Sequence, residues 1–360
     1  MTSTMMEVRR DDLRSVRWSD ARAADLDEGQ ARLRIDHFAL TANNVTYAVF
    51  GDAMSYWQFF PADDGWGRVP VWGFADVEAS RVDGLGEGDR VYGYLPMATD
   101  VVVTPARVND GSFVDAAAHR SALPPVYNQY QRVTADPTYD PSREREYAIL
   151  RPLFMTSFLI DDWLADDEMF GARSVVLASA SSKTALGLAH LLSTRDGVDV
   201  VGLTSAANAE FVRSVGYYDR TIEYENIGDL PADTPTVFVD MAGGGRVLGD
   251  VHRHLAGALM QSCLVGATHW EESAPPADLP GPRPTFFFAP DRLVKRRADW
   301  GPGGVESRVA TAWQEFLRSV DGWLTIVERH GRDNIEATWL EVLEGRASPD
   351  TGYVLSLTRA

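Results

Sequence analysis

The hydrophobic and polar positions divide the chain into three regions with different patterns. Up to about residue 150, short runs such as 31–40 and 98–108 are rich in apolar β-formers, and a Gly-rich turn separates two more within 76–95. Short runs with alternating apolar residues are typical of half-buried strands, and Gly and Pro mark the turns between them. We therefore predict that the first region consists mainly of β-strands.

The middle region alternates wholly apolar runs with runs of helical spacing. The runs at 174–180 and 198–205 show no polar alternation, which is typical of strands buried on both faces. Between them, Ala185, Leu188 and Leu192 recur at the spacing of one helix face. The same rhythm of strand and helix continues and predicts a parallel, doubly wound sheet.

The last region combines a loop with further helical patterns. A Pro-rich segment at 272–284 precedes a long helical pattern at 305–324, and the chain closes with a helix-like stretch at 334–347 and a strand-like run at 352–358. A polar, loop-rich segment also lies at 118–150. Long loops inside compact chains are usually functional or lid-forming, so this segment is a candidate for substrate contacts.

The charge of the chain argues against one class of partner. Its 360 residues include 34 Lys and Arg against 52 Asp and Glu, for a net charge of −18. Such a surface repels phosphate backbones, so we predict no nucleic-acid partner. Any anionic ligand must be held locally, by helix N-termini or by a few basic side chains.

Cysteine content and apolar runs bear on the compartment. Cys263 is the only cysteine, which excludes an internal disulfide and a thiolate zinc cage. The longest apolar runs fall far short of the ~20 residues that a membrane span needs, and the N-terminus lacks the apolar stretch of a secretory signal. We expect a cytoplasmic protein with no membrane partner, and a homodimer is compatible with the sequence.

Several stretches, in order along the chain, resemble a single superfamily. They are EGQARLRIDHFALTANNVTYAVFG, VPVWGFADVEAS, GDRVYGYLPMATDVVVTPARV, LFMTSFLIDDWL, VVGLTSAANAEFVRSVGYYDRTIEY, VDMAGG, LVGATHW and EVLEGRASPDTGYVLSL. On these residues the chain is similar to the medium-chain dehydrogenase/reductase superfamily, in its zinc-free quinone oxidoreductase and enoyl reductase branch. Within that branch it most resembles the DUF2855 group.

The resemblance implies an α/β protein of two domains. A GroES-like, β-rich catalytic domain would comprise residues 1–152 and 326–360. A doubly wound Rossmann domain at 153–325 would bind the nucleotide. The final strand, 352–358, would belong to the first domain.

The zinc ligands of related dehydrogenases are missing. Where the superfamily usually has Gly-His-Glu, this chain reads Gly73-Phe74-Ala75, and Cys263 lies in the wrong place. His252 and His254 fall in a predicted helix, where residues two apart face different directions, and we expect both to be exposed to solvent. We therefore predict no catalytic metal.

The phosphate-binding loop of the branch normally carries three glycines, and this chain has Ser179, Ser182 and Ala185 at those positions. Hydroxyls and one ammonium group at a helix N-terminus can bind an anion and offset the lost glycines. The alternative is an ordinary capped helix whose Lys183 points to solvent. The pyrophosphate candidates are Ser179, Ser181, Ser182, Lys183 and Thr184.

The end of the second apolar strand bears on the choice of cofactor. NAD-binding Rossmann proteins usually carry an acid there for the ribose 2′-hydroxyl, whereas this chain has Thr204 and Ser205. NADP, supplied as NADPH, is therefore the cofactor we expect. The basic run 295–297 is a candidate to reach the 2′-phosphate. By resemblance, the remaining cofactor contacts would be Asn208, Tyr224, Gly243 and Gly266.

The loop TANNVTYAVFG is the predicted catalytic segment, because in the resembling reductases it enters the active site. Tyr47 would donate a proton or polarise a carbonyl, and Asn44 would hold an enolate oxygen. The alternatives are that the asparagines cap a turn and that Tyr47 packs in the core. Tyr127, Asn128 and Tyr130 are candidates for substrate contacts or for anchoring their loop. Core packing is expected for Trp57, Phe59 and Phe60.

These features predict an NADPH-dependent, zinc-independent reductase of a small activated alkene or carbonyl, such as an enone, a quinone or an enoyl thioester. The alternative is a cofactor-free, non-catalytic binding module derived from the same fold. A nucleotide kinase is excluded because SSKT lacks both glycines of a P-loop. A serine hydrolase of the GxSxG type is excluded because that motif does not occur.

Overall fold

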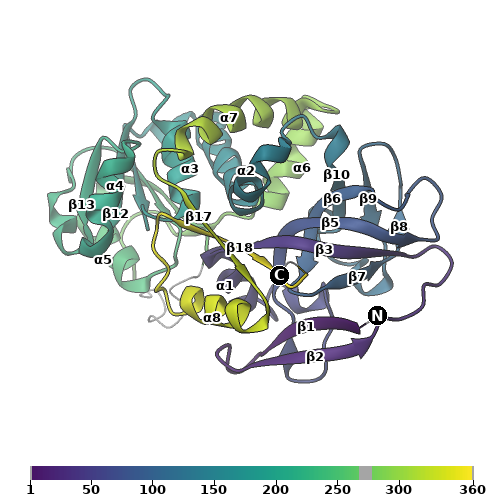
Figure 1. The fold of residues 1–360 in the computed structure, drawn as a ribbon. Coiled ribbons are helices and arrows are strands. Elements are labelled where there is room, and N and C mark those ends of the chain that lie inside the picture. Colours follow the sequence, from purple (N-terminus) through teal and green to yellow (C-terminus); the bar gives the residue numbers. More distant parts are fainter. Residues whose placement is uncertain (1, 267–277, 359–360) are drawn as a thin grey trace. The chain divides into compact units, whose positions relative to one another are not determined.

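The computed structural model describes residues 2–266 and 278–358 (Figure 1). The Pro-rich segment predicted at 272–284 and the end of the LVGATHW stretch lie partly outside the described residues. The chain divides into two compact units: unit 1 comprises Met1–Ile149 and Thr325–Ala360, and unit 2 comprises Leu150–Leu324. The division falls inside the long helix α2 (Glu144–Asp166). No helix among the described residues is both long and apolar enough to cross a membrane.

Unit 1 is dominated by antiparallel strands. Its larger sheet has the order β17-β18-β3-β5-β6-β10-β9-β8, with β7 also paired to β3, and a smaller sheet has the order β2-β1-β4. The strands are β1 (Thr2–Arg9), β2 (Val16–Arg22), β3 (Ala31–Leu40), β4 (Trp66–Gly67), β5 (Pro70–Ser80), β6 (Arg90–Pro96), β7 (Asp100–Val103), β8 (Pro105–Ala106), β9 (Ser112–Asp115), β10 (Gln129–Arg132), β17 (Thr325–His330) and β18 (Thr351–Ser356).

The C-terminal strand completes the sheet of unit 1. β18 pairs antiparallel with β3, through Val354 and Ala39, and parallel with β17. The helices of this unit are short. They are α1 (Ala42–Val49), α8 (Arg332–Leu343) and the 3-10 turns η1 (Tyr56–Gln58), η2 (Ala118–Arg120), η3 (Pro125–Tyr127), η4 (Val133–Ala135) and η5 (Pro141–Arg143).

Unit 2 contains a six-stranded sheet in the order β13-β12-β11-β14-β15-β16, and every neighbouring pair is parallel. Numbered from its own first strand, this order is 3-2-1-4-5-6, the arrangement of dinucleotide-binding Rossmann sheets. The predicted fold class, a GroES-like β-rich domain plus a doubly wound Rossmann domain, is confirmed. The strands are β11 (Ser174–Ala178), β12 (Asp199–Thr204), β13 (Arg220–Glu223), β14 (Thr236–Asp240), β15 (Leu259–Leu264) and β16 (Thr285–Phe286).

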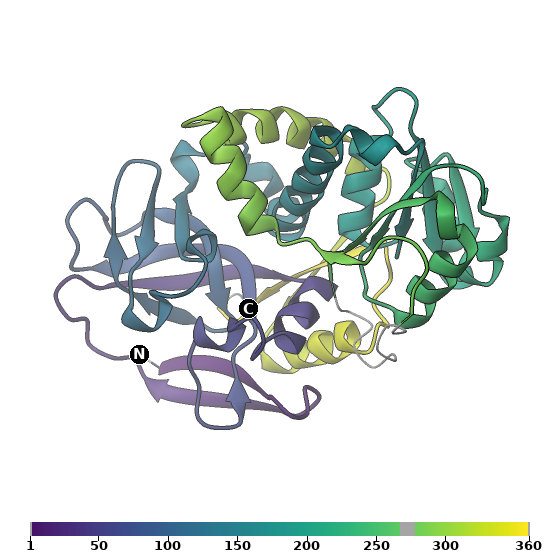
Figure 2. The same ribbon diagram turned by 180° about the vertical axis from the view of Figure 1, so that it is seen from behind.

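Helices cover both faces of this sheet (Figure 2). All residues of the central strands β11 and β14 are buried, as their unbroken apolar pattern predicts. The helices are α3 (Lys183–Leu192), α4 (Ala209–Val215), α5 (Gly245–Leu255), α6 (Ala289–Trp300) and α7 (Gly304–Val320), with the short turns η6 (Glu168–Gly171), η7 (Ala206–Asn208), η8 (Tyr224–Asp229) and η9 (Ala256–Ala258).

Helices α2 and α3 approach each other closely. The Ser157 hydroxyl donates a 2.8 Å hydrogen bond to the carbonyl of Thr184, and a Cβ at Gly187 would lie 2.8 Å from the same hydroxyl oxygen. This contact fixes the first turn of α3, where the predicted phosphate loop ends.

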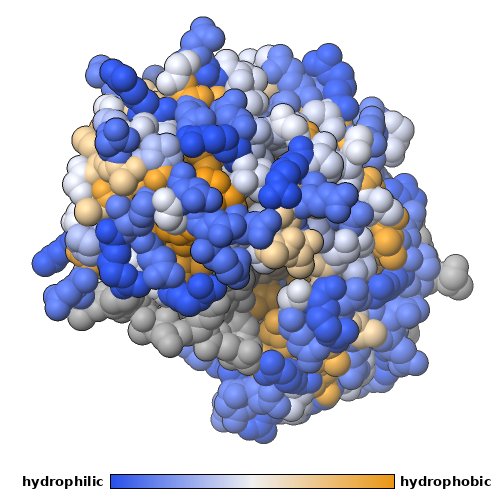
Figure 3. Space-filling model, turned by 90° about the vertical axis from the view of Figure 1, so that its left-hand side faces the viewer, coloured by the Kyte–Doolittle hydropathy of each residue, from blue (hydrophilic) through white to orange (hydrophobic). Residues whose placement is uncertain are grey.

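Figure 3 faces the side on which β13, α4 and α5 lie in Figure 1, and hydrophilic residues predominate there.

Candidate functional site

The turn after β11, the predicted phosphate loop, is tight although it lacks the three glycines. Ser179 adopts a left-handed backbone with φ of 53°, a region that favours glycine. The Ser182 amide then donates to the Ser179 carbonyl over 2.8 Å. The Ser182 side chain caps α3 by accepting from the Ala185 amide at 3.2 Å. Strand, tight turn and helix thus follow one another as a phosphate loop requires.

Side chains from two neighbouring strand ends hold this loop. The Ser179 amide donates to the Tyr224 hydroxyl over 3.0 Å, and Tyr224 directly follows β13. The Asn208 side-chain amide donates to the Ser181 hydroxyl over 3.1 Å from the turn after β12. Because parallel strands end at one edge of the sheet, four predicted residues meet there.

Close packing beneath the loop involves two residues that sequence reasoning missed. A Cβ at Gly202 would lie 2.9 Å from the Cβ of Ala180, so only glycine allows the loop to approach β12 this closely. The Tyr218 hydroxyl donates to the Ala180 carbonyl over 2.8 Å. Gly202 interrupts an apolar run, which is a usable signal of close backbone approach. Nothing in the local pattern distinguishes Tyr218 from a core tyrosine.

The remaining predicted cofactor residues lie at or near the same edge. Thr204 ends β12 and is buried, while Ser205 is half-buried. Gly243 has φ of 75° after β14, where its amide donates to the Asp240 carboxylate over 3.0 Å. Gly266 lies in the segment that follows β15. Lys183 and Thr184 form the first turn of α3, and both are half-buried.

The basic run 295–297 lies on α6 and is engaged with carboxylates of helices. Arg296 Nε bonds Asp162 at 2.7 Å, and this contact raises the pKa of the guanidinium. Lys295 Nζ lies 2.7 Å from Asp299, and Arg297 pairs with a glutamate of α7. These ion pairs do not support the prediction that the run reaches a 2′-phosphate.

In unit 1, the catalytic candidate Tyr47 lies in a cluster of aromatic rings. Its ring centroid is 4.8 Å from that of Tyr56 and 5.4 Å from that of Tyr94, and its hydroxyl accepts from the Trp72 indole over 3.2 Å. Burial raises the pKa of Tyr47 above its ordinary value, and the neighbouring Tyr56 adds to the effect. The phenol therefore stays protonated across the neutral range.

The other aromatic members come from several elements. Tyr127 packs on Tyr94 at 4.9 Å, and its hydroxyl lies 3.4 Å from that of Tyr56. Trp72 and Tyr127 are half-buried, whereas Tyr56 and Tyr94 are buried. Sequence reasoning found Tyr47 and Tyr127 but missed the other three, because strand and turn residues spaced this far apart carry no common pattern. We call these five residues, Tyr47, Tyr56, Trp72, Tyr94 and Tyr127, the tyrosine cluster.

Asn44 holds the helix that carries Tyr47. Its Oδ1 accepts from the Thr41 amide over 2.8 Å, closing a capping box at the start of α1. Its Nδ2 donates to the Pro70 carbonyl over 2.8 Å, which fastens α1 to β5. Asn44 is buried, and these bonds account for both ends of its amide.

Asn128 and Tyr130 are both buried, and Tyr130 bonds the backbone of a member of the tyrosine cluster. The Asn128 amide donates to the Arg120 carbonyl over 3.2 Å, and the Tyr130 hydroxyl donates to the Tyr94 carbonyl over 2.8 Å. The Arg120 guanidinium lies 4.6 Å from the ring centroid of Phe60. Trp57, Phe59 and Phe60 are buried, in keeping with the packing role expected for them.

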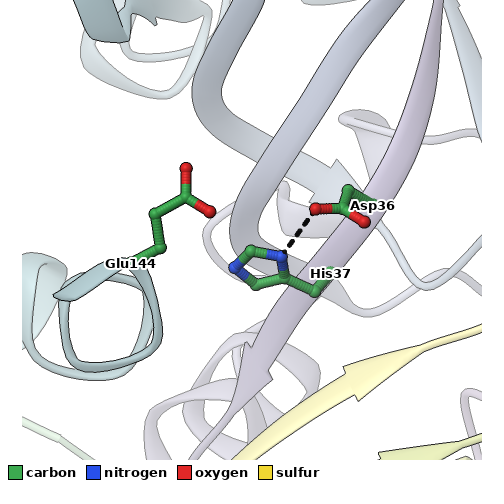
Figure 4. Close-up of side chains that lie close together, drawn as sticks. All are labelled: Asp36, His37 and Glu144. Atoms are coloured by element: carbon green, nitrogen blue, oxygen red, sulfur yellow. Dashed lines mark hydrogen bonds and ion pairs between the residues drawn. The ribbon is translucent and has the colours of Figure 1, made fainter. Parts of the chain in front are cut away.

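A buried charged cluster is a further candidate site in unit 1. It consists of Asp36, His37 and Glu144, which each offer one atom of a kind that can bind a metal, and these three atoms lie within 4.8 Å of one another. Figure 4 shows the His37 ring between the two carboxylates. The β3–β5 register shifts between Ile35 and His37, a bulge that accompanies the placing of consecutive side chains in one cluster. Sequence reasoning gave no sign of this cluster.

A guanidinium already pairs with those carboxylates. Arg90 bonds Asp36 at 2.8 Å, Asp76 at 2.8 Å and Glu144 at 2.6 Å. Burial alone would raise the pKa of Glu144, but hydrogen bonds from Arg90 and Tyr139 outweigh it and hold that pKa below its ordinary value. Arg90 supplies a positive charge that these carboxylates share, so a cation placed there would compete with its guanidinium.

The match to a protein family covers most of the chain. Residues 38–348 match the family described as "Protein of unknown function (DUF2855)". The chain belongs to the DUF2855 family. No curated protein matches the chain.

Solved structures identify the fold of this DUF2855 protein. CurA from Vibrio vulnificus in complex with NADPH has a TM-score of 0.67 at 15% identity, covering 99% of this chain and 100% of that chain. A mutant enoyl thioester reductase from Candida tropicalis has a TM-score of 0.59 at 9% identity, covering 99% of this chain and 100% of that chain. The yhdH oxidoreductase from Salmonella enterica in complex with NADP has a TM-score of 0.56 at 13% identity, with the same coverage of the two chains. The predicted medium-chain dehydrogenase/reductase fold is confirmed.

The structure locates the residues of this DUF2855 protein that bear on the zinc prediction. Phe74, which the resemblance aligns with a histidine of zinc-dependent dehydrogenases, is fully buried, and burial raises the pKa of the Cys263 thiol. The prediction that His252 and His254 are solvent-exposed is wrong. His252 is buried, with its ring nitrogens 2.9 Å from the Pro280 carbonyl and 2.8 Å from a serine hydroxyl. His254 is half-buried, and its ring bonds a different backbone carbonyl. It is covered because the buried face of α5 is wider than the sequence pattern indicated.

Proposed function

We propose that this protein is an NADPH-dependent, zinc-independent reductase of a small activated alkene or carbonyl, such as an enone, a quinone or an enoyl thioester. The observation that carries the proposal is the turn after β11. There a left-handed Ser179, a capped α3 and the side chains of Asn208 and Tyr224 meet at the carboxyl edge of a parallel sheet. In open α/β sheets, ligands bind outside that edge, where the strand order reverses.

The residues present fit a dinucleotide. Ser179 already adopts the backbone that a phosphate loop needs, and Gly202 allows the loop to lie close to β12. We assign the pyrophosphate to the first amides of α3 with Ser181, Lys183 and Thr184. The complexes of CurA with NADPH and of yhdH with NADP support this assignment, since both proteins share the fold.

The adenosine end would meet neutral donors. Thr204 and Ser205 stand where an acid would hold a ribose 2′-hydroxyl, and Asn208 and Tyr224 lie beside them. Hydroxyl and amide groups donate to a 2′-phosphate that a carboxylate would repel, which favours NADPH over NADH. Gly243 and Gly266 would border the rest of the nucleotide.

In unit 1, we assign the proton to Tyr47 and the substrate to the half-buried rim of the tyrosine cluster. When bound, NADPH supplies a hydride. The Tyr47 oxygen accepts the Trp72 N–H, so its own O–H remains the group that it can donate to a carbonyl oxygen or to an adjacent carbanion. Asn44 positions α1, and Tyr127 and Trp72 offer aromatic surface to a flat substrate.

Calorimetric titration with NADPH and with NADH tests the first half of the proposal. We expect saturable binding of both, tighter for NADPH, followed by consumption of NADPH with a member of a panel of enones, quinones and enoyl thioesters. If neither nucleotide binds at millimolar concentration, the reductase proposal fails. The cofactor-free binding module would then lead, and the Tyr224 hydroxyl on the Ser179 amide would be a permanent closure of the loop.

The cytoplasmic location and the homodimer stay predictions from the sequence. Fractionation of the producing cells tests the first, and light scattering of the purified protein tests the second. We propose a small molecule as the substrate. The net charge of −18 continues to argue against a nucleic-acid partner.

A further inference from the structure

The proposed adenosine site presents a charge problem. A 2′-phosphate carries about two negative charges at neutral pH, and this protein has a net charge of −18. Thr204, Ser205, Asn208 and Tyr224 are uncharged, and the basic run 295–297 pairs with carboxylates of helices. The neutral donors favour NADPH only weakly, and a cation within reach of the end of β12 would strengthen that preference through charge-assisted hydrogen bonds.

Arg213 meets that requirement. It lies on α4, the helix that follows β12, and its guanidinium pairs with Glu223 at 3.3 Å. Glu223 ends β13 and stands in register with Thr204 on the adjacent strand. Tyr224, which bonds the phosphate loop, is the next residue. The side chain of Arg213 is 55% exposed and that of Glu223 is 29% exposed, so the pair borders solvent at the edge of the sheet.

We propose that Arg213 and Glu223 form an exchangeable ion pair that makes the site selective for a 2′-phosphorylated dinucleotide. In the free protein Glu223 holds the guanidinium beside Thr204. When the phosphate is present, Arg213 turns from the carboxylate to the phosphate. The inference rests on the proposed function, because it assigns residues to the cofactor of that function.

The energetics favour such an exchange. An exposed ion pair between two flexible side chains contributes little, whereas a guanidinium binds phosphate through strong, charge-assisted hydrogen bonds. Glu223 also repels the phosphate directly. It therefore opposes NADPH binding in two ways, by holding the Arg213 guanidinium and by repelling the phosphate. Neither effect acts on NADH, which has a hydroxyl in place of the phosphate. The pair should therefore change the ratio of the two affinities and leave shared contacts alone.

Calorimetry on three variants of the full chain tests the inference. Arg213→Gln should weaken NADPH about tenfold, as expected for loss of one charge-assisted bond, and leave NADH unchanged. Glu223→Gln should tighten NADPH severalfold. The matched control is Arg253→Gln, an arginine of α5 that is 58% exposed and also paired with an aspartate, and it should change neither affinity.

The outcomes separate this inference from the proposed function. If the parent protein binds neither nucleotide, the function and the inference fail together. If the parent binds NADPH but Arg213→Gln leaves the affinity ratio unchanged, or weakens both nucleotides equally, only the inference is overturned. Titration with adenosine 2′,5′-bisphosphate against adenosine 5′-monophosphate gives a second reading, in which only the bisphosphate should lose affinity in Arg213→Gln.

Discussion

The candidate sites of the two units are formed by different kinds of chemical groups. In unit 2 the site consists of polar side chains and backbone groups gathered where β11, β12 and β13 end, with Ser179 and Tyr224 in direct contact. In unit 1 it consists of large rings from α1, η1, η3, β5 and β6, packed against one another. The first site is determined by topology and the second by side-chain packing. Perturbations should therefore act locally in unit 2 and spread through the core in unit 1.

The largest expected effect comes from the charged cluster of unit 1. Arg90→Met removes the guanidinium that Asp36, Asp76 and Glu144 share, so we expect a loss of about 3 kcal/mol in the free energy of unfolding. Urea denaturation followed by tryptophan fluorescence measures it. Arg34→Met is the matched control, because Arg34 also bonds Asp76 but is 45% exposed. Equal losses in the two variants would show that burial of the cluster is unimportant.

The same cluster predicts a dependence of stability on pH. The pKa of Glu144 is held below its ordinary value, 4.5, in the folded state. A depressed carboxylate stabilises the fold at pH values above its unfolded pKa, and this contribution is lost as the pH falls through the folded pKa. We expect the unfolding free energy to fall on acidification below about pH 4.5 in the parent. The fall should be shallower in Glu144→Gln, and identical acid profiles would contradict this assignment.

Removing one hydroxyl should separate chemistry from binding. Tyr47→Phe keeps the ring and its packing but removes the proposed proton donor, so we expect turnover to drop about a hundredfold with the affinity for NADPH intact. Stopped-flow turnover beside calorimetry gives both quantities. Tyr130→Phe is the control, since it removes a buried hydroxyl bonded to the Tyr94 carbonyl and should lower stability without a comparable loss of turnover. Unchanged turnover in Tyr47→Phe would remove Tyr47 from the mechanism.

A change in the phosphate loop should affect both cofactors alike. Lys183 is one of two lysines in the chain, and the other, Lys295, pairs with Asp299 on α6. Lys183→Ala should weaken NADPH and NADH equally, by about tenfold, because the pyrophosphate is common to both. Lys295→Ala should leave both affinities unchanged. A loss confined to NADPH would move Lys183 from the pyrophosphate to the 2′-phosphate.

The smallest effect should be a gain. Ser179 holds φ of 53°, where a side chain is strained, so Ser179→Gly should stabilise unit 2 by about 1 kcal/mol. Ser182→Gly is the opposing control, because it removes the hydroxyl that caps α3 from a residue with φ of −72°. Thermal unfolding should rise in the first variant and fall in the second. A fall of the unfolding temperature in both variants would mean that the Ser179 hydroxyl contributes more stability than the strained Ser179 backbone costs.

Neighbours in sequence and neighbours in space differ in how far they could be foreseen. Ser181, Ser182 and Lys183 follow an apolar strand directly, so a helix N-terminus at the sheet edge was predictable from order alone. Arg213 was overlooked, although it lies only eight residues after Ser205, because the strand register that puts Glu223 beside Thr204 is not visible in the chain. The exposure of His252 was wrongly predicted because its hydrogen-bond partners, Pro280 and Ser262, come from other segments of the chain.

The sequence by itself determined the parallel sheet of unit 2 and the place of the turn that we propose as its phosphate loop, since apolar runs buried on both faces must alternate with covering helices. Through the resemblance it also predicted that the usual zinc ligands are absent. Only the tertiary structure decided that Tyr47, Tyr56, Tyr94 and Tyr127 form one cluster, and that Arg90 bonds three carboxylates. The physical reason is that periodicity reports which face of an element is buried. Which side chains meet across elements depends on strand register, on the bulge at Asp36 and on packing, and none of these leaves a local pattern.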